Sequence, residues 1–239
     1  MDGLVRTRTS TIVEVALNGP WGKVRQPLAP IAVADIVADG VACAKAGAAV
    51  VHVHPYDEVS GRQNDDLETY VRIIEGIREQ VDVLVYPSAP FVDNDDINRY
   101  SVTEQLAERG LIQWATVDPG SLNIARYDDI AQGRAGFVYR NSEAALKEAL
   151  AMASRLQIVP SYACYEPGHI RLGAALHAMH ANAPTPVYRL MLSDEFTFGF
   201  PPRGYALEAY AALFSDLGLD VQVAGGQQQF GLLNIRPTA

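Results

Sequence analysis

The sequence has few cysteines, few basic residues and no long hydrophobic run. Cys43 and Cys164 lie far apart and match no paired motif, so both are expected to be free thiols. The formal charge of −9 leaves no basic surplus to neutralise phosphates, which argues against a nucleic-acid partner. No window is long enough to span a membrane, and MDGLVRTRTS lacks the apolar core of a signal peptide. We therefore expect no membrane partner and a cytoplasmic location.

The sequence does contain a regular alternation of two patterns. Apolar, β-branched runs occur at 11–17, 48–54, 81–87, 111–117, 157–163, 186–192 and 219–225. Stretches with helical spacing lie between them; one has Val33, Ile36 and Val41 on a single face and Gly47 at its end. The spacing of Ser101 and Glu104 is that of a capping box. Strands that alternate with helices predict a parallel sheet with right-handed crossovers.

The ends of the expected strands favour a (β/α)₈ TIM barrel over an open, doubly wound sheet. The first strand-to-helix turn, NGPWGKVRQP, is no dinucleotide fingerprint, and the sequence contains no P-loop. Polar residues instead follow many strands, as barrel active sites require: Asn18, His52, His54, Ser88, Thr116, Asp118, Glu166, Asp194 and Glu195. We predict one TIM-barrel domain over residues 1–239, in which LLNIR is at best a short eighth strand and the eighth unit is short or missing.

The stretch AAVVHVHPYDE (48–58) places two histidines at the end of an apolar run. Side chains two apart on a strand share a face, so His52 and His54 are expected side by side. Neutral imidazoles in this arrangement can bind one divalent metal ion. The alternative is a hydrogen-bonded pair without a metal.

Five motifs in order carry a resemblance to a known family. They are HVH (52–54), YPSAP (86–90), WATVDPGSLN (114–123), YEPGH (165–169) and VAGG (223–226). Together they resemble the β-keto acid cleavage enzymes, a family that includes 3-keto-5-aminohexanoate cleavage enzyme. The resemblance implies a TIM barrel, a homo-oligomer (a dimer or tetramer) and a divalent metal, normally zinc. It also implies a reaction in which a β-keto acid and acetyl-CoA give a new CoA thioester and acetoacetate.

The resemblance assigns roles to four positions. The metal histidines of the family fall on His52 and His54, its active-site serine on Ser88 and its threonine on Thr116. Each hydroxyl could donate to an oxyanion or a carboxylate. The alternative is that Ser88 is a turn residue between prolines and Thr116 a β-branched strand residue.

The chain departs from the family where strand eight should supply an arginine, a metal-binding glutamate and a catalytic aspartate. It contains no segment resembling GGHxRxGxED. The candidate replacements include three carboxylates, and Asp194 and Glu195 after strand six could also face the substrate or be solvated. Glu14 could ligate the metal or pair with Arg189, and Asp118 could be catalytic or a turn residue. Glu166 could be a catalytic base or the N-cap of a helix.

Other residues are expected to bind the substrate. Trp21 stands where the member that cleaves the amino substrate has an acidic residue, and Tyr86 would line an apolar mouth, so an uncharged side chain is expected. Asn18 ends the first strand. Gly225 and Gly226 could hold a CoA phosphate or form a plain turn.

Two other functions stay open. Amidohydrolases also bind metal through an HxH pair, but on the first strand of their barrel. A degenerate, non-catalytic homologue would keep the fold without the strand-eight residues.

Overall fold

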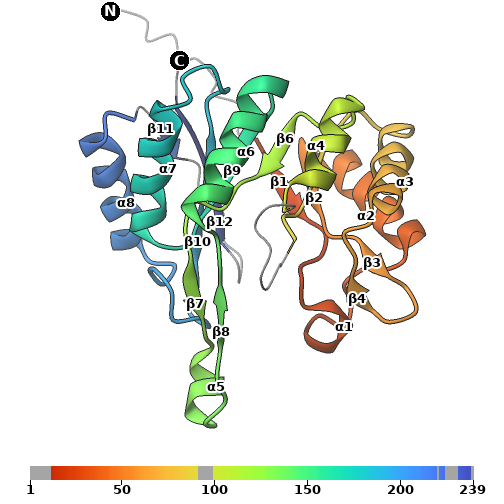
Figure 1. The fold of residues 1–239 in the computed structure, drawn as a ribbon. Helices are drawn as coiled ribbons and strands as arrows, with labels where there is room; N and C mark the ends of the chain where they lie inside the picture. The colour runs from red at the N-terminus through yellow and green to blue at the C-terminus, as the bar shows by residue number, and fades with distance from the viewer. Residues whose placement is uncertain (1–11, 91–98, 220, 224–230, 238–239) are drawn as a thin grey trace, which may run out of the picture.

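The computed structural model describes residues 12–90, 99–219, 221–223 and 231–237, in which strands alternate with helices (Figure 1). The strands are β1 (Glu14–Ala16), β2 (Val50–Val53), β3 (Tyr56–Asp57), β4 (Arg62–Gln63), β5 (Leu84–Pro87), β6 (Trp114–Thr116), β7 (Leu122–Ile124), β8 (Phe137–Tyr139), β9 (Val159–Cys164), β10 (Val187–Leu192), β11 (Val221–Val223) and β12 (Gly231–Pro237). The helices are α1 (Gly22–Arg25), α2 (Val33–Lys45), α3 (Leu67–Arg78), α4 (Ser101–Glu108), α5 (Tyr127–Ala131), α6 (Glu143–Leu156), α7 (Pro167–Ala178) and α8 (Gly204–Asp216).

The strands that carry the expected site residues form two sheets. One sheet has the order β1-β2-β5, and both of its pairings are parallel. The other has the order β11-β12-β10-β9-β6, in which β6, β9 and β10 pair in parallel. The predicted parallel α/β arrangement is therefore confirmed for six of the seven expected strands.

A closed barrel is not shown by the described residues. They contain no backbone pairing between β5 and β6, which would join the two sheets. The expected eighth strand also differs from a barrel strand, because β12 is antiparallel to both β10 and β11. β11 ends at Val223 and β12 begins at Gly231, so the connection is shorter than the dozen or so residues that a parallel crossover needs.

Two groups of helices cover the outer faces of the sheets (Figure 1). In α3, the Asp66 side chain accepts a hydrogen bond from the Thr69 backbone N–H at 2.8 Å and caps the helix, while Ile73, Ile74 and Ile77 are fully buried. The capping box expected at Ser101 is wrong, because α4 begins with Ser101 and its N-cap is Tyr100.

An antiparallel arm projects from the end of the molecule (Figure 1). It consists of β7, α5 and β8, and β7 pairs with β8 from Leu122↔Tyr139 to Ile124↔Phe137. At its base, Leu122, Ile124, Tyr139, Phe196 and Phe198 form a separate apolar cluster, against which Trp21 packs. The arm therefore brings residues of three distant segments to one edge of the site.

Candidate functional site

His52 and His54 lie together at the carboxyl end of β2. Both are buried, and their ring centroids are 5.0 Å apart. Burial, the neighbouring His54 and then Arg189 lower the pKa of His52 well below its ordinary value. Burial lowers the pKa of His54 to about 4. Both imidazoles are therefore neutral at pH 7, which is the form that ligates a metal.

Gln63 of β4 fixes the tautomer of His54. The Gln63 amide nitrogen donates to Asp65 Oδ1 at 3.1 Å and to Ser88 Oγ at 3.3 Å. The amide oxygen therefore faces His54 Nδ1 at 3.0 Å and accepts its proton. This leaves the His54 Nε2 lone pair available to a ligand.

The residues present fit a divalent metal in part. His52 Nδ1 is buried and has no hydrogen-bond partner in the described residues, and an orphaned imidazole nitrogen suits a ligand. Within those residues, however, no group of three or more His, Cys, Asp or Glu side chains is placed to hold a metal ion. The described part of the chain thus offers two candidate ligands, and no third His, Cys, Asp or Glu side chain joins them there.

Glu14, the expected third ligand, is held by Tyr86. The Tyr86 hydroxyl donates to Glu14 Oε1 at 2.5 Å. The Tyr86 ring lies between His52, at a centroid distance of 4.6 Å, and the Arg189 guanidinium carbon, at 5.8 Å. Burial lowers the pKa of the Arg189 guanidinium, but Tyr86 and then Glu14 raise it, and the pKa lies above its ordinary value. This geometry favours the ion-pair alternative for Glu14.

The two expected hydroxyls differ in what they can donate. Thr116 Oγ1 donates to the Pro87 carbonyl at 2.9 Å, so its proton is already committed to the backbone. Ser88 Oγ accepts from Gln63 and lies 2.9 Å from the Tyr70 hydroxyl, whose single proton can go either to Ser88 Oγ or to Asp65 Oδ1 at 3.3 Å. When Tyr70 donates to Ser88, the serine keeps its own proton for a ligand.

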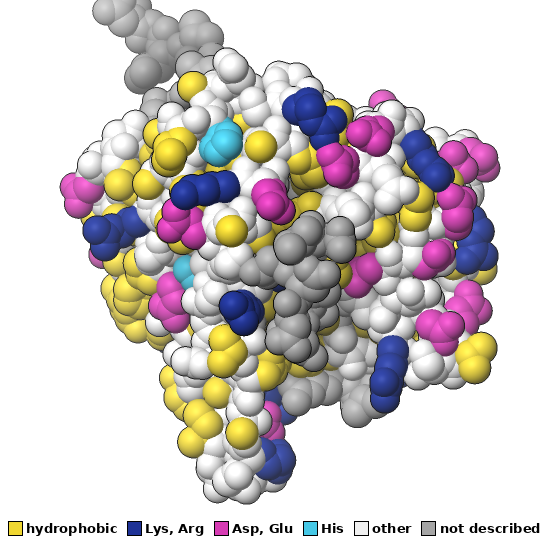
Figure 2. Space-filling view, viewed as in Figure 1, with side chains coloured by type: hydrophobic (Ala, Val, Ile, Leu, Met, Phe, Trp, Pro, Cys, Tyr) yellow, Lys and Arg dark blue, Asp and Glu magenta, His cyan; other side chains and the backbone are white. Residues whose placement is uncertain are grey.

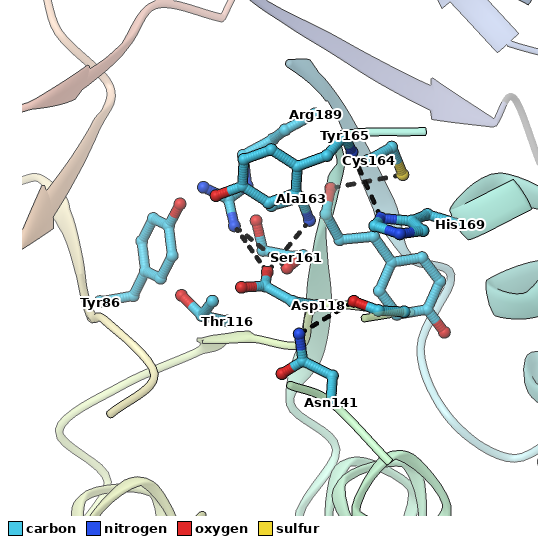
Figure 3. Close-up of polar contacts among 12 residues, drawn as sticks. Tyr86, Thr116, Asp118, Asn141, Ser161, Ala163, Cys164, Tyr165, His169 and Arg189 are labelled. Atoms are coloured by element: carbon cyan, nitrogen blue, oxygen red, sulfur yellow. Dashed lines mark hydrogen bonds and ion pairs between the residues drawn. The ribbon is translucent and has the colours of Figure 1, made fainter. Parts of the chain in front are cut away.

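Asp118 is the centre of a buried polar network (Figure 3). It accepts hydrogen bonds from the Tyr139 hydroxyl and, at 3.4 Å, from the Ala163 N–H. Arg189 Nη2 lies 3.9 Å from Asp118 Oδ1 and donates to the Ser161 carbonyl at 3.3 Å. Asp118 is therefore a charge partner inside the sheet as well as a candidate catalytic group.

Glu166 and Asn18 hold the backbone of neighbouring loops. Glu166 occupies the N-cap position of α7 without a side-chain cap bond, and its carboxylate instead accepts from the Gly199 N–H at 3.0 Å. The buried Asn18 amide exchanges two hydrogen bonds of 2.9 Å with the backbone of His54. Asn18 thus holds the backbone of His54 at the end of β2. Gly225 and Gly226 lie outside the described residues.

A small pocket opens beside Gln63. It has a volume of about 230 Å³ and is lined by Pro20, Trp21, Gln63, Asp65 and Phe137. Asp65 lies beside Trp21 in this pocket, so a carboxylate is present there although Trp21 replaces the acidic residue of the amino-cleaving member. The uncharged substrate side chain stays a prediction. Burial raises the pKa of Asp65, while hydrogen bonds from Gln63 and Tyr70 oppose the rise.

The sequence did not single out Gln63, Asp65, Tyr70 or Tyr139 as site residues. Gln63 and Asp65 follow Tyr56 and Asp57 in a polar loop whose β3–β4 hairpin turns back over the end of β2. Gly61, with a φ of +65°, was a turn signal in this loop. Tyr139 reaches Asp118 only through the arm, which no local pattern predicts.

An α/β fold with polar groups at the ends of parallel strands is typical of an enzyme active site. The family model for the beta-keto acid cleavage enzymes (BKACE) matches residues 10–233. The chain belongs to this family. No helix in the described ranges has both the length and the apolarity to cross a bilayer.

Two curated relatives match parts of the chain. The 3-dehydrocarnitine:acetyl-CoA trimethylamine transferase of Rhizobium meliloti (strain 1021) is 27% identical over 158 residues, which cover 59% of this chain and 50% of the relative. The 3-keto-5-aminohexanoate cleavage enzyme of Fusobacterium nucleatum subsp. nucleatum is 33% identical over 103 residues, or 42% of this chain and 36% of the relative. The matches thus span half or less of these relatives.

The solved structures of ObcA share the fold. Its binary complex with oxaloacetate has a TM-score of 0.56 at 15% identity, and its apo structure has a TM-score of 0.54 at 16% identity. The match covers 80% of this chain and 48% of the ObcA chain in the complex. At this identity the likeness concerns the fold alone.

Proposed function

We propose that this protein takes part in metal-dependent β-keto acid cleavage with acetyl-CoA as co-substrate, with His52 and His54 as metal ligands. In this reaction the bond between the keto carbon and its α-carbon breaks, and the acyl group moves to CoA as a thioester. The acetyl group of acetyl-CoA joins the released two-carbon carboxylate as acetoacetate, so the atoms balance. Support comes from the family and from the buried, neutral histidine pair.

A bound zinc or other divalent ion would polarise the keto group of the substrate. The residues of the chain have separate tasks. Ser88 would donate its proton to the substrate carboxylate or to the oxyanion when Gln63 and Tyr70 both donate to its oxygen. Asn18 holds the His54 backbone in place.

The proton chemistry needs a base that is not engaged elsewhere. Asp118 and Glu166 both have protein partners, so either would act as a base only after exchanging a hydrogen bond. Thr116 would serve as an acceptor, because its proton is bound to Pro87. These assignments give Ser88 the largest direct effect of the hydroxyl residues.

The test is an assay of acetoacetate formation from acetyl-CoA and a panel of β-keto acids, with zinc supplied. Turnover that is lost in Ser88→Ala and in the His52→Ala, His54→Ala double variant supports the proposal. Ser60→Ala, an exposed loop change in the same region, is the control and should retain activity. Zinc binding without turnover of any acid would indicate a non-catalytic homologue instead.

A further inference from the structure

We propose that Tyr70 and Asp65 form a proton relay that connects Ser88, which is buried just after β5, to the open pocket that Asp65 lines. The inference rests on the proposed function, because it assigns the path by which protons reach and leave the hydroxyl that would contact the substrate. Tyr70 and Asp65 act through Ser88 and do not contact the reacting atoms themselves.

The three side chains form a continuous path of hydrogen-bond contacts. Ser88 and Tyr70 are both buried, with exposed fractions of 3% and 1%. The Tyr70 hydroxyl lies 2.9 Å from Ser88 Oγ and 3.3 Å from Asp65 Oδ1. Asp65 is only partly buried and lines the pocket beside Gln63. The path therefore leads from a buried hydroxyl to a carboxylate that can exchange protons with the pocket.

The Tyr70 hydroxyl carries one proton and can pass it in two directions. Donation to Ser88 Oγ leaves the serine proton for the substrate, whereas donation to Asp65 leaves the tyrosine oxygen to accept from Ser88. The contact of the same hydroxyl with the Ser88 carbonyl is longer, at 3.4 Å. The two arrangements of the Tyr70 proton are the two states that a relay requires.

Gln63 holds both ends of this path in place. Its amide nitrogen donates to Asp65 Oδ1 at 3.1 Å and to Ser88 Oγ at 3.3 Å. An amide does not titrate in this way, so Gln63 positions the two groups without carrying the proton between them.

The surroundings of Asp65 bring its titration nearer to neutral pH than that of an exposed carboxyl. Burial raises the pKa of Asp65, while hydrogen bonds from Gln63 and Tyr70 and the charge of the buried Arg99 oppose the rise. Burial, the first cause, and the nearby Asp65 raise the pKa of Tyr70 well above its ordinary value. Tyr70 is therefore suited to pass a proton on without remaining ionised.

The proton transfers balance over one cycle. As a nucleophile adds to the keto carbon, Ser88 donates its proton to the oxyanion, Tyr70 donates to Ser88, and protonated Asp65 donates to Tyr70. When the adduct collapses and the carbonyl forms again, the protons move back and Asp65 regains its own. The net change in protons is zero, and the relay needs no further reactant.

Infrared titration of the Asp65 carboxyl tests the relay without turnover, and Asp65→Asn identifies the band by its loss. Ser88→Ala should shift the Asp65 pKa, although the hydrogen bonds of the serine side chain run to Gln63 and Tyr70. In a Tyr70→Phe background the same change should have no effect, because the shared proton is gone. An Asp65 pKa that ignores Ser88→Ala, or a shift that persists in Tyr70→Phe, would overturn the relay.

The acetoacetate assay gives the second measurement. Asp65→Asn and Tyr70→Phe should each lower kcat by about 100-fold or more and change KM by less than about two-fold. The double variant should be no slower than the slower single variant, since both changes interrupt one path. Asp82→Asn and Tyr205→Phe, the same changes at exposed positions, should keep the parent kcat.

Thermal melts of each variant identify any loss of fold. Additive losses in the double variant, or a raised KM in place of a lowered kcat, would contradict the relay. If the parent turns over no β-keto acid, the proposed function fails, and the infrared titration still decides on the relay. Turnover by the parent with an Asp65 pKa that ignores Ser88→Ala contradicts the relay alone.

Discussion

The amide oxygen of Gln63 lies 3.0 Å from Nδ1 of His54, and this contact sets which nitrogen of the imidazole faces the site. The Gln63 amide nitrogen is engaged by Asp65 and Ser88, so the side chain cannot turn over without losing both contacts. Gln63, which lies on the two-residue strand β4, thereby orients His54 at the end of β2.

Replacing Gln63 with alanine should weaken zinc binding by about 10- to 100-fold, because partners of metal-bound histidines commonly contribute that much. Competition with a chromogenic chelator measures the affinity. Gln105→Ala, on the exposed face of α4, is the control and should bind zinc as the parent does. Equal affinity in Gln63→Ala would show that the contact does not orient a ligand.

Metal content provides a direct check of the histidine pair. Protein purified without chelator should contain stoichiometric zinc, and the His52→Ala, His54→Ala double variant should lose it. His177→Ala is the matched control, since His177 belongs to α7 outside the candidate site. Elemental analysis measures the zinc content of the parent, the double variant and the control. The same zinc content in the double variant and the parent would contradict the proposed ligands.

The apo protein should lose stability as the pH falls from about 6.5 to about 4. The folded state keeps His52 and His54 neutral, since burial lowers the pKa of each, whereas the unfolded chain binds protons near its ordinary pKa. The unfolded state therefore binds more protons in this window. Because the pKa of His54 is lowered to about 4, this residue alone would reduce the free energy of unfolding by about 3 kcal/mol once the pH is below 4.

Urea unfolding at pH 7.5, 5.5 and 4.5 measures this dependence. His54→Gln should flatten the curve between pH 6.5 and 4. A variant curve that runs parallel to that of the parent would show that other groups cause the acid sensitivity.

Removing the Arg189 charge should destabilise the fold. Arg189 and Asp118 are both almost fully buried, and Arg189→Met would leave the carboxylate of Asp118 without its cation. Breaking a buried ion pair in this way costs about 3–5 kcal/mol. Chemical denaturation measures the loss, and Arg189→Met, Asp118→Asn should recover part of it. If the double variant is no more stable than Arg189→Met, the two charges are not coupled.

A homo-oligomer, a dimer or tetramer, stays a prediction of the sequence. The arm exposes apolar side chains, including 65% of Val138 and 53% of Ile130, and Figure 2 shows apolar side chains along this part of the surface. Light scattering coupled to gel filtration at micromolar concentration should give a multiple of 25.9 kDa. A monomeric mass would contradict the prediction. Val138→Lys should shift the mass toward the monomer if the arm lies at the interface.

The sequence alone determined the parallel α/β class and the histidine pair. Apolar runs with helical stretches between them are local patterns, and the period of two along a strand places His52 and His54 together without any tertiary information. The family motifs likewise stand in the order of the chain, and the family model confirms the resemblance over residues 10–233.

Only the tertiary structure decided what each polar side chain contacts. A carboxylate at the end of a strand can be a ligand, a base or an ion-pair partner, and packing from distant segments selects among these. Tyr86 reaches Glu14 across 72 positions, and Asn18 reaches His54 across 36. The antiparallel β12 and the meeting of Asp65 with Trp21 and Phe137 also depend on loops that bring distant residues together, and such contacts leave no periodic signal in the sequence.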